Sequence, residues 1–176
     1  MREESKKILT LPIRLALVLL IIGALFKIMH WPYSLILIFT AVVTLVLLYI
    51  IRFLNKKSRN KLDYVKLGIV VLWSIGYFLK VSHVFKHRYI LDIVVAILFL
   101  YWFCNDNPYY LIHRKFKKRG IIKVVYQILK VFTILSLIFG VLFKIQHWPY
   151  GSILFTQGIM SLCLFLVLDY FIVESA

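Results

Sequence analysis

Lysine and histidine recur at one fixed spacing along this chain of 176 residues, and they are its main candidates for chemistry. Three copies of the pattern Gly-x-x-x-Lys-x-x-His are present: Gly23, Lys27 and His30; Gly76, Lys80 and His83; Gly140, Lys144 and His147. Positions i, i+4 and i+7 of a helix share one face. Each copy is therefore expected to place a small residue, a cation and an imidazole along the same side of a helix.

Two interpretations of the lysines are open. Each ammonium group either reaches up to the membrane surface while its methylenes stay in apolar surroundings, or points into the bundle to engage an acid, an ion path or a partner helix. Lys80 is a special case, because Asp92 is expected about one turn down the next, antiparallel helix. We predict that Lys80 and Asp92 form an ion pair.

Three interpretations of the histidines are open: hydrogen bonding at a turn, proton acceptance near neutral pH, or convergence on a metal ion. Cysteine or acidic ligands are absent beside them, and we predict no metal and no cofactor. The chain also lacks Gly-x-Ser-x-Gly, His-Glu-x-x-His and paired carboxylates. We therefore predict that it is not an enzyme.

The residues around the repeated lysines indicate how helices meet. Gly23, Gly76 and Gly140 are predicted to let a neighbouring helix approach closely. Two of the copies continue into a Trp-Pro pair, Trp31 and Pro32 or Trp148 and Pro149. Tryptophan favours the membrane–water interface, and proline ends one helix and suits the first turn of the next. We predict a tight turn at each Trp-Pro pair.

Long apolar segments set the fold class. The composition is 62% hydrophobic with a mean hydropathy of +0.91, and a bilayer core is spanned by about 20 apolar residues. Six apolar runs are present: 13–30, 33–54, 65–83, 89–104, 124–147 and 150–173. We predict an all-α polytopic membrane protein in which six transmembrane helices form three antiparallel hairpins. The hairpins cover 11–54, 64–104 and 122–173 of a single membrane domain, 1–176, and 105–120 is expected to be the longest connection.

The formal net charge of +15 is distributed unevenly. Of the 22 Lys and Arg residues, all but Lys27, Lys80, Lys86, Arg88 and Lys144 fall on one predicted side. Basic residues mark the cytoplasmic side, so both termini are predicted to face the cytoplasm from a bacterial inner membrane. The basic loops are expected to contact anionic lipid head groups, and no nucleic-acid partner is expected.

Opposite charges occupy matching places in the first and third hairpins. Arg52 follows His30 by 22 residues, as Asp169 follows His147. Both residues are expected at the cytoplasmic boundary. They either pair with each other or are solvated, and the second arrangement is the one we predict.

The ten residues 23–32, Gly-Ala-Leu-Phe-Lys-Ile-Met-His-Trp-Pro, resemble the first hairpin of GldL, the transmembrane stator subunit of the bacterial gliding motor and its linked secretion system. The resemblance is close again at 140–149 and weak at 76–83. It implies hairpins that surround the membrane helices of a stalk subunit, with proton flow driving rotation. By the same resemblance, Lys27, His30, Lys144 and His147 correspond to polar positions near the outer face.

One departure from GldL bears on activity. The resemblance implies a glutamate about four turns into the second helix of a hairpin, as the proton carrier, but the corresponding positions fall near Leu45, Leu98 and Leu162. We therefore predict a structural or assembly component that contacts a partner's transmembrane helix or further copies of itself. The alternative is a small transporter or channel with an outer vestibule lined by the repeated lysines and histidines.

Overall fold

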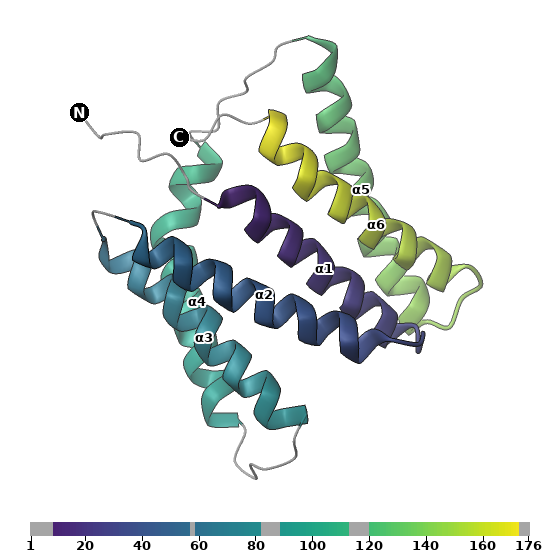
Figure 1. Ribbon diagram of the computed structural model, residues 1–176. Coiled ribbons are helices and arrows are strands. Elements are labelled where there is room, and N and C mark those ends of the chain that lie inside the picture. The colour runs from purple at the N-terminus through teal and green to yellow at the C-terminus, as the bar shows by residue number, and fades with distance from the viewer. Residues whose placement is uncertain (1–8, 57–58, 82–88, 113–119, 173–176) are drawn as a thin grey trace. The chain divides into compact units, whose positions relative to one another are not determined.

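The computed structural model describes residues 9–56, 59–81, 89–112 and 120–172, which form helices and turns without any strand (Figure 1). The helices of this part of the chain are α1 (Thr10–Ile28), α2 (Ser34–Leu54), α3 (Lys61–Val81), α4 (Tyr89–Ile112), α5 (Ile121–Ile145) and α6 (Gly151–Ile172). All except α4 are long and apolar enough to cross a membrane, and the apolar part of α4, Tyr89–Asn105, is shorter. The prediction of an all-α polytopic membrane protein is confirmed.

The start of the predicted 105–120 connection is wrong, because α4 continues without a break to Ile112. The polar segment Asn-Asp-Asn-Pro lies inside the helix. Asn105 Nδ2 donates a hydrogen bond of 2.7 Å to the carbonyl of Tyr101, one turn earlier. Polar residues at the end of a transmembrane helix favour exposure to water, and that does not require the helix to stop.

The chain divides into two compact units. In the first unit, which comprises residues 1–41 and 115–175, α6 packs against both α1 and α5 (Figure 1). The second unit comprises residues 42–114 and contains the rest of α2 with the paired helices α3 and α4.

Small residues bring α5 and α6 into close contact. A Cβ atom added to Gly140 would lie only 2.6 Å from the Cα atom of Phe155, and one added to Gly158 would lie 2.9 Å from the backbone nitrogen of Leu137. Thr133 and Ser136 of α5 are buried on the same side as Gly140. In a bilayer, where the hydrophobic effect does not drive helices together, such close backbone approach supplies the packing energy.

Gly23 has the same role between α1 and the beginning of α2, because an added Cβ would lie 2.8 Å from Ile38 Cγ1. Gly76 differs: among the described residues, nothing lies within 4 Å of a Cβ added there. The close helix contact predicted at Gly76 is therefore not present in this part of the chain. Instead, α3 meets α4 through larger side chains, such as Leu98, whose Cδ1 lies 3.9 Å from a Cβ added to Gly68.

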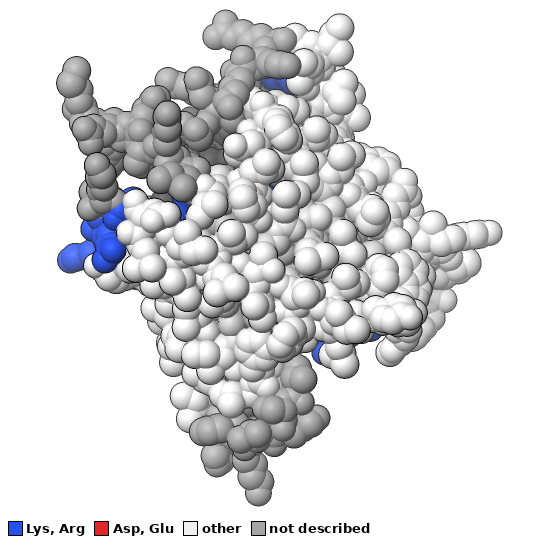
Figure 2. Space-filling view, in the orientation of Figure 1, with Lys and Arg blue, Asp and Glu red and all other residues white. Residues whose placement is uncertain are grey.

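The connection between α2 and α3 is held by polar and aromatic contacts. Lys56 Nζ lies 2.5 Å from Asp63 Oδ2, and the same oxygen accepts a hydrogen bond of 2.8 Å from the backbone N–H of Asn60. Phe53 and Tyr64 pack edge to face, with ring centroids 5.0 Å apart. Basic side chains gather beside this connection in Figure 2, whereas most of the other described residues visible in that view are neither acidic nor basic.

The glycine contacts give a stability prediction. Gly140→Leu and Gly23→Leu should lower the melting temperature in detergent by about 5 °C or more, because the added side chain must displace neighbouring backbone or Ile38. Gly68→Leu is the matched control, since a Cβ there makes only an ordinary contact. Equal shifts for all three variants would show that close approach at Gly23 and Gly140 does not stabilise the fold.

Candidate functional site

The first copy of the repeated motif forms the C-terminal cap of α1. The backbone N–H of Trp31 donates to the carbonyl of Phe26 at 2.8 Å, and that of His30 donates to the carbonyl of Lys27 at 3.3 Å. This pair of bonds is the Schellman motif, which satisfies carbonyls that a helix end would otherwise leave without partners. The rings of Phe26 and Trp31 pack edge to face at 4.9 Å, which supplies the apolar contact that accompanies the motif.

The same cap closes α5. Trp148 donates to the carbonyl of Phe143 at 2.9 Å, and His147 donates to the carbonyl of Lys144 at 3.3 Å. The Phe143 and Trp148 rings are again 4.9 Å apart. The role of the two phenylalanines was missed in the sequence, although the spacing Phe-x-x-x-x-Trp-Pro carries its signal. Pro32 and Pro149 follow directly, where a residue without an N–H does not continue a helix.

The histidines of these two turns contribute to the caps through their backbone conformation. His30 has a φ of 55° and His147 a φ of 53°, both in the left-handed region. Glycine usually occupies this place, and histidine is among the few other residues enriched there. Both side chains are exposed, and no group of three or more metal-binding side chains occurs in the described residues. His83 lies outside the residues that the structure describes.

The repeated lysines have three different surroundings. Lys80 Nζ lies 2.6 Å from Asp92 Oδ1 and 2.8 Å from Oδ2, so the predicted ion pair is confirmed. The Lys80 side chain is 41% exposed and the Asp92 side chain 48%, and ion pairs with such exposure contribute little stability. Lys144 is half-buried, with Nζ 3.5 Å from Met29 Sδ and 5.2 Å from the centre of the Phe155 ring. Lys27 is exposed.

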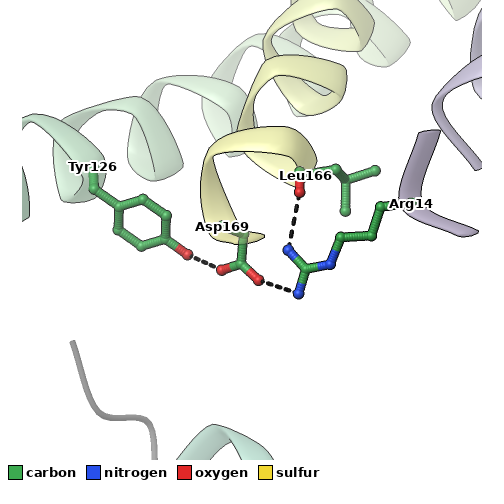
Figure 3. A network of polar contacts seen from close by, with 4 residues as sticks. All are labelled: Arg14, Tyr126, Leu166 and Asp169. Carbon is green, nitrogen blue, oxygen red and sulfur yellow. Dashed lines mark hydrogen bonds and ion pairs between the residues drawn. The ribbon is translucent and has the colours of Figure 1, made fainter. Parts of the chain in front are cut away.

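A buried polar network connects α1, α5 and α6 at the ends of these helices that lie away from the two caps (Figure 3). Arg14 of α1 contacts Asp169 of α6 with an N–O distance of 2.9 Å, and its other terminal nitrogen donates to the carbonyl of Leu166 at 3.0 Å. The hydroxyl of Tyr126 in α5 donates to the second carboxylate oxygen of Asp169 at 2.5 Å. One acid of α6 therefore connects this helix to both α1 and α5.

This network corrects the prediction that Asp169 is solvated or pairs with Arg52. Asp169 is only 6% exposed, and its ionic partner is Arg14. By sequence alone, Arg14 is one of the many basic residues on the predicted cytoplasmic side, and nothing near it in the chain indicates a partner. Helix α1 begins at Thr10, so Arg14 lies within the first turns of a helix that packs on α6.

The sequence profile described as the GldL N-terminal domain matches residues 15–67 and 136–171, together just over half the chain. The chain belongs to the GldL N-terminal domain family. The two matched segments contain the Schellman caps at 26–31 and 143–148, and residues 68–135 lie outside the match. Among curated proteins and solved structures, none matches the chain significantly. Membership of the GldL family confirms the resemblance of the first and third hairpins.

The caps predict how the histidine positions respond to substitution. His147→Gly should keep the melting temperature of the wild type or raise it slightly, because glycine adopts a positive φ without steric cost. His147→Val should lower the melting temperature by about 2–6 °C, because a β-branched residue is strained there. The same order should hold at His30. Equal losses for glycine and valine would instead assign the stabilising role to the imidazole itself.

Proposed function

We propose that this GldL-family chain is a non-enzymatic component of a membrane complex related to gliding or secretion machinery, with a structural or assembly role. It would lie in the bacterial inner membrane with both termini in the cytoplasm. Its family membership, carried by two separate hairpins, is the observation that supports the proposal most directly.

The placement of acids supports a role other than that of a proton-driven motor. Asp63, Asp92 and Asp169 lie in the first or last turns of their helices, and each contacts a cation. Leu45 and Leu162 stand in the middle of α2 and α6, where the family resemblance implies a glutamate. A carboxylic acid that binds and releases protons is the group such a motor needs, and leucine does not supply it.

The surfaces of the helices support contact with lipids or with other membrane helices. Much of α4 and α5 is apolar and exposed, including Ile93, Ile97, Ile128 and Leu135. Positive side chains beside the α2–α3 connection favour anionic lipid head groups. The proposed partners are therefore membrane lipids and the transmembrane helix of a partner protein or a second copy, not nucleic acid.

Two measurements test this proposal, one on the purified chain and one in native membranes. In liposomes, an assembly component should give no proton or anion flux above protein-free vesicles. In native membranes, cross-linking through cysteines placed on the exposed face of α5, at Ile128 or Leu135, should join the chain to a membrane subunit of the gliding or secretion machinery. Anion flux that is lost in Lys27→Gln and Lys144→Gln would favour the transporter alternative, and proton flux would contradict the proposal.

The topology is tested by reporter fusions. Fusions after Ser58 and Asn105 should report a cytoplasmic position, and fusions after Tyr33 and Tyr150 an external one, because most basic residues flank the first pair. An external signal at Asn105 would mean that the shorter apolar part of α4 does not cross the membrane.

A further inference from the structure

The contact between α1 and α6 joins the first hairpin to the third inside one compact unit. These two hairpins align residue for residue with a shift of 117, as between Lys27 and Lys144. The same shift relates their close contacts, since Gly23 meets Ile38 and Gly140 meets Phe155. Equivalent helices of the two hairpins therefore present equivalent backbone surfaces.

The charges at this junction do not follow the repeat. Arg14 of α1 corresponds to Val131 of α5, and Asp169 of α6 corresponds to Arg52 of α2. At these matching positions, the first hairpin has a cation on its first helix and the third hairpin has an acid on its second helix. Val131 is 54% exposed, whereas the matching Arg14 is held against α6.

The side chains of this network are largely buried, so another partner of α6 has little access to them. The Asp169 side chain is 8% exposed and the Arg14 side chain 21%. Tyr126, from the third hairpin itself, donates a hydrogen bond to one carboxylate oxygen, and Arg14 contacts the other. Removing one member of a buried ion pair costs far more than the pair gains over apolar packing, because the remaining charge is left without a partner.

Other pairings of the hairpins lack this complementarity. If two copies of the first hairpin met in the same geometry, Arg14 would lie opposite Arg52. If two copies of the third hairpin met, Asp169 would lie opposite Val131 and would lose the ionic contact that Arg14 makes. Proteins reject wrong partners by such like-charge and unpaired-charge contacts.

We propose that Arg14 and Asp169 determine which helix packs on α6: they direct it to α1 of the same chain and away from α5 of a second copy. The two residues are thus specificity determinants of the junction between hairpins. The inference depends on the hairpin repeat and the α1–α6 contact, and it holds whether or not the chain serves gliding or secretion machinery.

A charge exchange in the full chain tests the pair. Arg14→Asp and Asp169→Arg should each lower the melting temperature in detergent by about 6–20 °C. Their combination should recover at least half of that loss. The exposed pair is the matched control, in which Lys80→Asp or Asp92→Lys should shift the melting temperature by less than about 3 °C.

Where a reversal prevents folding, the milder variants Arg14→Gln and Asp169→Asn measure the same coupling. The loss in the double variant should be smaller than the sum of the two single losses, because both changes remove the same ionic contact. Additive losses, or an exchange without recovery, would overturn the proposal.

Moving the cation tests specificity separately from stability. Arg14→Val combined with Val131→Arg transfers the charge to the matching place on α5, where it can meet Asp169 of a second copy. Cross-linking in membranes should then give larger species than Arg14→Val alone. A size distribution equal to that of Arg14→Val, or full recovery of wild-type stability without larger species, would show that Asp169 does not select its partner helix.

Discussion

The hydrogen-bonded cap at the ends of α1 and α5 is the constraint on which the hairpins depend. In a bilayer, backbone N–H and C=O groups need hydrogen-bond partners within the protein, and the last carbonyls of a helix have none within the helix itself. The carbonyls of Phe26 and Phe143 are satisfied inside the turn, and each Phe packs against the Trp that closes it. The repeated motif is therefore a structural element that ends α1 and α5 and turns the chain back.

Once the caps turn the chain back, backbone contact keeps paired helices together. The close approach at Gly140 and Gly158 joins α5 to α6, and Gly23 brings α1 to the start of α2. The sequence of the middle hairpin lacks the Trp-Pro pair of the motif, and Gly76 makes no close contact within the described residues. Its divergence in sequence thus coincides with different packing, and it also lies largely outside the family match.

The charged residues divide by depth of burial. Lys80 and Asp92 are exposed, so their attraction is weakened by water. Arg14 and Asp169 lie in the interior of the first unit, where an unpaired charge is costly. The buried pair is therefore the one that can select between helices whose backbones are alike.

The sequence by itself determined the helices, the turns and the family. The length of each apolar run predicts a membrane span, and each Trp-Pro pair predicts a turn. The ion pair of Lys80 and Asp92 follows from their similar depth on consecutive antiparallel helices. All of these features depend on residues near one another in sequence. Only the tertiary structure decided that Asp169 binds Arg14 and that Gly140 contacts Phe155. It also decided that Gly76, among the described residues, has no such close neighbour. A sequence gives the depth of a side chain in the membrane, but its partner depends on how each helix is rotated and on which helices are neighbours.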